Sequence, residues 1–124
     1  MEGPGCYYLP TLLDRVTLDH NSFKEELFGP VASVIRCSSA DEAVALANNT
    51  DFGLGAAVWT ADLELARTMS REIDAGAVFI NGMVASDARL PFGGIKKSGY
   101  GRELGSYGLR EFTNIKTVWT GPAK

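Results

Sequence analysis

The chain has 124 residues, of which 45% are hydrophobic and 22% are charged, and its formal net charge at pH 7 is −3. These values are ordinary for one globular domain with a modest core, and the acidic balance argues against a nucleic-acid partner. No apolar run approaches the ~20 residues that cross a bilayer, and the start lacks the charged and then apolar pattern of a signal peptide, so we expect a cytoplasmic protein without membrane contact.

The first half of the chain predicts two strands and a helix. Cys6–Leu13 is apolar and aromatic, but Pro10 restricts it to an edge or irregular strand. Val31–Cys37 is rich in β-branched residues and predicts a confident strand. Ser39 then opens a helix, and Glu42, three residues later, is expected to complete a capping box.

The second half continues the alternation of strands and helices. Leu54–Trp59 and Ala77–Asn81 are continuous apolar runs and predict buried strands. Between them, Asp62–Ile73 places apolar residues at helical spacing and predicts a helix with one buried face. Gly105–Phe112 predicts a short helix, and Thr113–Trp119 predicts a final strand. The order of elements therefore predicts an α/β fold, a mostly parallel sheet with flanking helices.

The final strand does not fit a closed three-strand domain. Thr113–Trp119 alternates polar and apolar residues, as a strand does when it adds to the edge of a sheet. If that sheet is not in this chain, it belongs to a partner. Residues 1–6 and 121–124 are expected to be loose ends.

The cysteines and the single histidine do not form a metal-binding pattern. Cys6 and Cys37 match no metal or redox spacing, and two cysteines in an unsecreted chain are more often buried thiols than a disulfide. His20 has no second metal-ligand candidate nearby, so it is expected at the surface or in a turn.

Two segments are candidates for ligand binding, and the first is Pro91–Gly105, PFGGIKKSGYGRELG. Its five glycines with Lys96, Lys97 and Ser98 suggest a phosphate cradle. However, the spacing fits neither the P-loop nor the dinucleotide fingerprint. The alternative is a tight loop whose lysines lie in water, and composition alone favours this alternative.

The second candidate is Lys24–Val31, KEELFGPV. A carboxylate at the edge of a sheet can accept hydrogen bonds from the two hydroxyls of a ribose, and an aromatic ring nearby can lie on a flat cofactor ring. The alternative is that the glutamates are solvated and Phe28 belongs to the core. That alternative is favoured for Glu25, and the two interpretations are balanced for Glu26 and Phe28.

The segments EELFGPV, NNTDFGLGAAVWT and AGAVFINGMVASDARLPFGGIKKSGYGRELGSYGLREFTNIKTVW, in this order, resemble the C-terminal part of NAD(P)-dependent aldehyde dehydrogenases. The resemblance covers about Gly5 to Trp119. The ASDAR segment and the ending REFTNIKTVW look most like bacterial succinate-semialdehyde dehydrogenases. The resemblance implies that residues 1–112 are the C-terminal portion of the catalytic domain and that residues 113–124 are an oligomerisation strand and tail.

The resemblance also implies a reaction and a set of roles. The family oxidises an aldehyde to an acid with NAD or NADP as the hydride acceptor. Glu26 matches the glutamate that holds the nicotinamide ribose, and Phe28 matches the aromatic residue beside the nicotinamide. Met83–Leu90 matches the loop at the aldehyde entrance, and Phe92, with the two glycines that follow it, anchors that loop and is expected to be one of the substrate-binding residues. Thr113–Trp119 matches the strand that extends a neighbour's sheet in a homo-oligomer.

The resemblance implies a preference for an acid semialdehyde, so two further residues are expected to bind this substrate. Ser86 and Arg89 are the candidates to hold the far carboxylate of the substrate, because a hydroxyl and a guanidinium are suitable partners for it. An equally weighted alternative is that Arg89 pairs with Asp87 on the surface of the loop.

The family's catalytic groups have no match in this sequence. Its nucleophilic cysteine, its general-base glutamate and the turn of its nucleotide fold lie in motifs upstream of EELFGP, and Cys6 and Cys37 stand in the wrong contexts for the nucleophile. We therefore expect a fragment without turnover of its own, and the choice between NAD and NADP stays open. The competing hypothesis is a non-catalytic, self-associating structural fragment.

Overall fold

A computed structural model describes residues 3–123. The chain divides into two compact units, Met1–Asp51 and Phe52–Lys124, which are described separately below. The expected loose ends fall partly outside the described residues, at Met1, Glu2 and Lys124.

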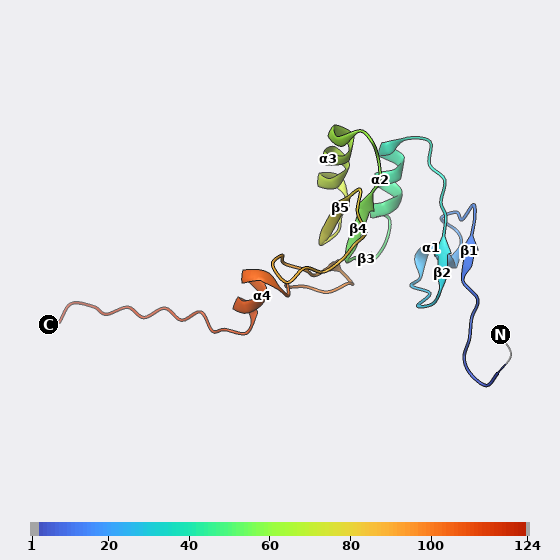
Figure 1. The fold of residues 1–124 in the computed structure, drawn as a ribbon. Coiled ribbons are helices and arrows are strands. Elements are labelled where there is room, and N and C mark those ends of the chain that lie inside the picture. The colour runs from blue at the N-terminus through green and yellow to red at the C-terminus, as the bar shows by residue number, and fades with distance from the viewer. Residues whose placement is uncertain (1–2, 124) are drawn as a thin grey trace. The chain divides into compact units, whose positions relative to one another are not determined.

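The first unit contains a parallel pair of short strands (Figure 1). Strand β1 (Thr11–Leu13) pairs with β2 (Val31–Ser33), and the short helix α1 (Asn21–Lys24), which the sequence did not predict, lies between them in the chain. Both strands are shorter than predicted. Strand β1 begins directly after Pro10, which has no N–H to donate to a ladder.

Helix α2 (Ala40–Asn48) confirms the predicted start at Ser39. The Ser39 hydroxyl accepts a hydrogen bond from the Glu42 backbone N–H at 3.1 Å. The Glu42 carboxylate does not close the predicted capping box on Ser39. It accepts instead from the backbone N–H of Ser38 at 2.7 Å and from the Ser38 hydroxyl at 2.6 Å, one residue further back.

The second unit begins with β3 (Phe52–Gly53) and then forms a β–α–β arrangement. Strands β4 (Gly55–Val58) and β5 (Ala77–Ile80) pair in parallel, and α3 (Leu63–Glu72) connects them and packs on both. The Asp62 carboxylate caps α3 by accepting from two backbone N–H groups, each at 3.0 Å. The predicted helix and its two strands are therefore confirmed with small changes at their ends. The predicted burial of the strands is wrong, because only Val58 of β4 and no residue of β5 is buried in this chain.

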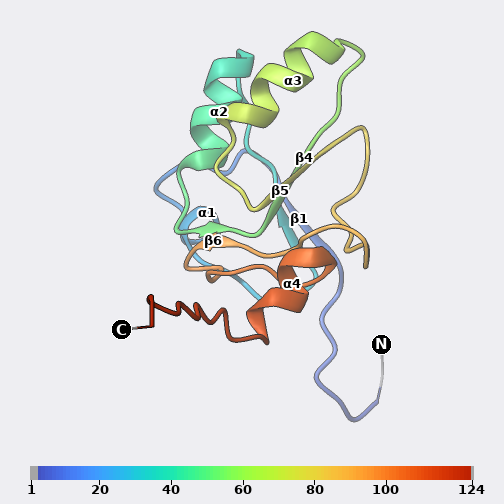
Figure 2. The ribbon, with the colours of Figure 1, turned by 90° about the vertical axis from the view of Figure 1, so that its left-hand side faces the viewer.

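The glycine-rich segment is ordered by pairing with residues far from it in the chain. Strand β6 (Ile95–Lys96) runs antiparallel to β3, and Phe92 forms an isolated bridge with Glu103. Helix α4 (Gly105–Glu111) follows, as predicted. Figure 2 shows this yellow-to-orange part of the chain passing from β5 through β6 to α4.

Two expectations about the sheet differ from the structure. The strands of residues 3–123 form three two-stranded sheets, two parallel and one antiparallel, so the expected α/β fold with mostly parallel pairing is confirmed but the single sheet is not. The predicted strand Thr113–Trp119 is not formed. Residues 114–123 belong to no helix or strand. A strand needs a paired neighbour, and none of the described residues supplies one for this segment.

The two units bury little apolar surface. Within residues 3–123 the buried apolar side chains are Val16, Val44, Val58 and Ala66. Many large apolar side chains are exposed, among them Phe28, Trp59, Met83, Leu109, Phe112, Ile115, Val118 and Trp119. An apolar surface of this extent is typical of a chain that contacts further protein.

Cysteine burial was predicted wrongly, because both Cys6 and Cys37 are exposed free thiols. His20 is exposed, as expected, and its Nδ1 accepts from the Thr17 N–H at 3.0 Å. None of the helices in residues 3–123 is long and apolar enough to cross a membrane.

Candidate functional site

The Glu26–Phe28 segment connects α1 to β2 in the first unit. Glu25 ends α1 in an extended conformation, with its N–H bonded to the Asn21 carbonyl at 2.8 Å. Glu26 follows and is exposed, so its carboxylate is open to a ligand. Phe28 has a φ of 46° and is 92% exposed. A bulky residue at positive φ is uncommon, and such strain occurs often at binding sites.

The turn after Phe28 is fixed by the strand pair that it enters. The Val31 N–H donates to the Gly29 carbonyl at 2.7 Å, and the Thr11 N–H donates to the Pro30 carbonyl at 2.9 Å. The exposure of Phe28 therefore follows from a defined backbone path into β2. The second of the two interpretations, in which Phe28 belongs to the core, does not fit this structure.

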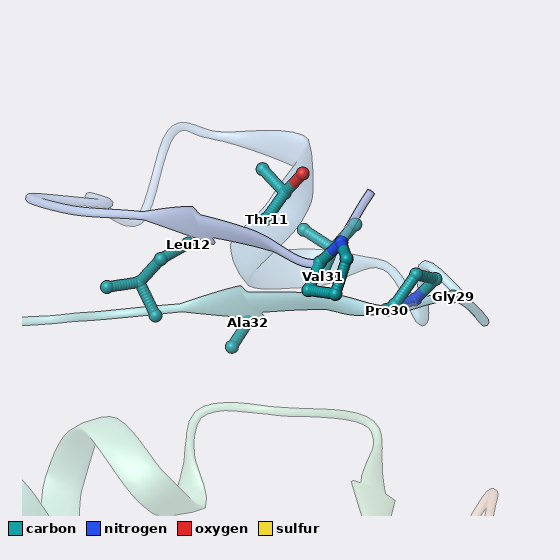
Figure 3. A pocket seen from close by; sticks show the side chains of 7 residues that line it. Thr11, Leu12, Gly29, Pro30, Val31 and Ala32 are labelled. Carbon is teal, nitrogen blue, oxygen red and sulfur yellow. The ribbon is translucent and has the colours of Figure 1, made fainter. Parts of the chain in front are cut away.

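An open, mostly apolar hollow lies beside this turn (Figure 3). It is lined by Pro10, Thr11, Leu12, Gly29, Pro30, Val31 and Ala32. Figure 3 shows Leu12 and Ala32 on one face of the strand pair and Thr11 on the other. Leu12 and Ala32 are register partners, and both are exposed. The face that these two side chains share is therefore apolar and exposed in the first unit.

The Met83–Leu90 loop leaves the end of β5 in the second unit. Asn81, at a φ of 52°, fixes its start, because its side-chain amide accepts from the Thr60 N–H and donates to the Thr60 carbonyl, each at 2.9 Å. Further along, Val84 lies directly over Gly55, where a Cβ would come within 2.7 Å of a Val84 methyl carbon. Sequence reasoning missed the role of Asn81, although an asparagine followed by glycine at the end of a strand is a turn signal.

The second half of the loop is a turn built around Asp87. The Leu90 N–H donates to the Asp87 carbonyl, and the Arg89 N–H donates to the Asp87 carboxylate, both at 2.9 Å. The Arg89 guanidinium also binds this carboxylate, with Nε at 2.9 Å from Oδ1 and Nη2 at 2.6 Å from Oδ2. These bonds lower the pKa of Asp87 and raise the pKa of Arg89.

The sequence left two alternatives for Arg89, and the structure contains the pair with Asp87. The Arg89 side chain is nevertheless 86% exposed. Ser86 is exposed on the same loop, one residue before the turn. The loop therefore presents a hydroxyl and a guanidinium to solvent, and the guanidinium already binds one carboxylate.

The glycine-rich segment Pro91–Gly105 holds the Met83–Leu90 loop in place through backbone hydrogen bonds. Phe92, which is half-buried, exchanges two backbone hydrogen bonds of 2.8 Å with Glu103. The Gly105 N–H donates to the Ala88 carbonyl at 3.1 Å, which ties the turn to the start of α4. These contacts hold the backbone of Phe92 and the end of the loop.

The polar side chains of the glycine-rich segment bind the protein itself. The Ser98 hydroxyl accepts from the Gly53 N–H at 3.0 Å, and Arg102 donates to the Gly94 carbonyl at 2.8 Å. Lys96 lies 3.7 Å from the carboxylate of Asp74. These contacts favour the tight-loop interpretation over a phosphate cradle. Within residues 3–123, no group of acidic, histidine and cysteine side chains is arranged to hold a metal ion.

The expected site residues fall in both units. Glu26 and Phe28 lie in the first unit, whereas Ser86, Arg89 and Phe92 lie together on one continuous segment of the second. Each group is positioned locally by hydrogen bonds within its own unit.

Comparisons with known proteins give one consistent family. Residues 1–118 match the model of the aldehyde dehydrogenase family. The chain is 57% identical over 121 residues to succinate-semialdehyde dehydrogenase (NADP(+)) 1 of Mycobacterium ulcerans, covering 98% of this chain and 26% of that protein. It is 53% identical over 119 residues to an Escherichia coli succinate semialdehyde dehydrogenase (NAD(P)+), covering 96% of this chain and 26% of that protein.

Solved structures show the same similarity. A succinic semialdehyde dehydrogenase from Streptococcus pyogenes, in complex with NADP+, matches with a TM-score of 0.90 and 37% identity over 98% of this chain and 27% of that chain. An NAD-dependent aldehyde dehydrogenase from Sinorhizobium meliloti matches with a TM-score of 0.90 and 46% identity over 100% of this chain and 25% of that chain. The chain thus spans about a quarter of the length of these proteins.

Proposed function

The chain belongs to the aldehyde dehydrogenase family, and we propose that it forms part of a longer NAD(P)-dependent enzyme that oxidises succinate semialdehyde to succinate. The observation that carries the proposal is the Met83–Leu90 loop, which is held at both ends and presents the Arg89 guanidinium to solvent. Two relatives, at 57% and 53% identity, are named for this substrate, which supports the same choice.

On the cofactor side, Glu26 and Phe28 act together. The exposed Glu26 carboxylate accepts hydrogen bonds from the two hydroxyls of the nicotinamide ribose. The Phe28 ring, which is 92% exposed, would offer a flat apolar surface to the nicotinamide. NAD or NADP supplies the hydride acceptor for the reaction.

On the substrate side, Ser86 and Arg89 bind the far carboxylate of the semialdehyde. The hydroxyl donates one hydrogen bond, and the guanidinium adds a charge-assisted bond. Phe92 has an indirect role, since its paired backbone holds the end of the loop that carries both residues. Holding the carboxylate fixes the distance of the aldehyde carbon from the entrance, which favours this substrate over an uncharged aldehyde.

The covalent step belongs to groups that have no match in this sequence. A cysteine thiolate attacks the aldehyde carbonyl, and a glutamate activates the water that releases the acid. Cys6 and Cys37 are exposed thiols, and neither stands in a motif that matches the nucleophile of the family. We therefore propose that the 124-residue chain has no turnover by itself.

A chimera tests this proposal. The chain replaces the matching 121-residue region of the Mycobacterium ulcerans relative, to which it is 57% identical. We expect NADP+-dependent oxidation of succinate semialdehyde by the chimera and none by the chain alone. A folded chimera without activity toward any aldehyde would contradict the proposal, as would turnover by the isolated chain.

A second candidate function, self-association, follows from the exposed apolar side chains at the C-terminal end. Phe112, Ile115, Val118 and Trp119 are all largely exposed. We propose that residues 113–124 are an oligomerisation strand and tail, in which Thr113–Trp119 adds to the sheet of a second copy. Light scattering during size-exclusion chromatography tests this, and a monomer at all concentrations would argue against it.

A further inference from the structure

We propose that Asp87 is a specificity-determining residue: its carboxylate occupies the Arg89 guanidinium when substrate is absent, and the carboxylate of the substrate must displace it. This inference rests on the proposed function, because it assigns Arg89 to the substrate. The inference adds that a carboxylate of the protein itself, that of Asp87, competes with the substrate for Arg89.

The geometry of the pair matches what an external carboxylate would adopt. Nε and Nη2 of Arg89 each bind a different oxygen of Asp87, at 2.9 and 2.6 Å. This two-point contact is the preferred arrangement of a guanidinium with a carboxylate. It uses one edge of the Arg89 fork and two of its five N–H donors. A substrate carboxylate that needs the same edge therefore competes with Asp87.

Exposure and charge make the exchange feasible. The Arg89 side chain is 86% exposed, whereas that of Asp87 is 36% exposed and is held in the turn. Asp87 is charged at neutral pH, and the bonds from the Arg89 side chain and backbone lower its pKa further. A substrate carboxylate arriving beside it therefore meets a guanidinium that is already occupied.

The opposite role for Asp87 is to orient Arg89 for the substrate, and the two roles predict opposite effects. If Asp87 competes, its removal tightens binding of a charged aldehyde. If Asp87 orients Arg89, its removal weakens that binding. An uncharged aldehyde is insensitive to the change in both cases.

Asp87→Asn in the chimera separates the roles. Asparagine keeps an oxygen that can accept from the Arg89 backbone N–H, so the turn is retained while the charge is lost. We expect KM for succinate semialdehyde to fall about two- to fivefold, the range of an exposed ion pair, with kcat unchanged. KM for butanal should stay the same. A rise in KM for succinate semialdehyde would overturn the proposal.

A double substitution supplies the matched control. In the Arg89→Ala background, Asp87→Asn should no longer change KM for succinate semialdehyde, because the guanidinium for which the carboxylates compete is gone. If Asp87→Asn lowered KM for succinate semialdehyde equally in both backgrounds, the effect would come from the loss of a negative charge near the site. That result would overturn the proposal.

A measurement on the 124-residue chain is independent of activity. By NMR, the Nε–H of Arg89 should exchange with water more slowly in the wild-type chain than in the Asp87→Asn variant, because the pair protects it. Equal rates would overturn the inference whatever the kinetics. A folded chimera that oxidises no aldehyde contradicts the proposed function, whereas normal turnover with an unchanged KM in Asp87→Asn contradicts only the role of Asp87.

Discussion

The backbone at Gly76 approaches the Gly93 carbonyl so closely that a Cβ on Gly76 would lie 1.7 Å from that oxygen. The Gly76 N–H also donates to the Gly53 carbonyl at 3.0 Å. Three glycines from separate segments thus bring β3, the start of β5 and the glycine-rich segment together. The support of the Met83–Leu90 loop depends on this contact between backbones.

Gly76→Ala should destabilise the second unit strongly, because the atom that it meets is backbone and cannot rotate away. We expect the free energy of unfolding to fall by about 3 kcal/mol or more. Urea unfolding of the 124-residue chain, followed by circular dichroism, measures this. Gly82→Ala is the control, because the nearest atom to its Cβ is 3.9 Å away, and an equal loss in both variants would contradict the role of this contact.

Asn81→Ala should destabilise the chain by about 1–3 kcal/mol, through two lost hydrogen bonds to Thr60 and the positive φ of the residue. Asn81→Gly loses the same bonds but tolerates the φ, so it should be about 1 kcal/mol less damaging. The same urea experiment compares the two variants. A larger loss for glycine than for alanine would show that backbone strain is not part of the effect.

The pKa of Glu42 is lowered by hydrogen bonds from the hydroxyl and then the N–H of Ser38. A carboxyl with a lowered folded pKa contributes stability above its usual value of 4.5, and this contribution is lost as the pH falls through the lowered value. Wild-type chain should therefore lose more stability between about pH 5 and 3 than Glu42→Gln does.

Urea unfolding at several pH values measures this difference for Glu42. Ser38→Ala removes the larger cause of the lowered pKa, so it should take away much of the difference between wild type and Glu42→Gln. Parallel pH profiles for wild type and Glu42→Gln would contradict the assignment.

Glu26→Gln in the chimera should raise KM for NADP+ about tenfold, because the ribose hydroxyls lose a charged acceptor. Glu25→Gln is the matched control, because Glu25 is adjacent to Glu26 and exposed but has no proposed contact with the cofactor. Steady-state kinetics at saturating aldehyde give both values. Similar increases in the two variants would mean that the local negative charge matters and the position does not.

Arg89→Ala in the chimera should raise KM for succinate semialdehyde about tenfold, the effect of losing a hydrogen bond to a charged group. KM for butanal should change little, because butanal has no carboxylate. Steady-state kinetics with the two aldehydes make the comparison. Equal increases for both would reject Arg89 as the partner of the substrate carboxylate.

Local interactions explain which elements could be predicted from the sequence. The starts of α2 and α3 followed from Ser39 and Asp62, because a cap binds N–H groups within three residues of itself. Strand lengths were less predictable. The expected strand Val31–Cys37 is longer than the observed β2. Strand β2 is short because its partner β1 is only three residues long.

The candidate site divides in the same way. The motifs identified Glu26, Phe28, Ser86 and Arg89, but no pattern in the sequence could choose between the two partners of Arg89. That choice depends on a turn in which Asp87 accepts from the Arg89 backbone and from its side chain together.

The sequence by itself determined the family and the order of α2, β4, α3, β5 and α4, because each is carried by a short run of neighbouring residues. Only the tertiary structure decided that the glycine-rich segment is a backbone support, that Asp87 occupies Arg89, and that Thr113–Trp119 has no strand partner among the described residues. These features depend on which distant segments of the chain contact one another. No local sequence pattern determines the free energy of such contacts.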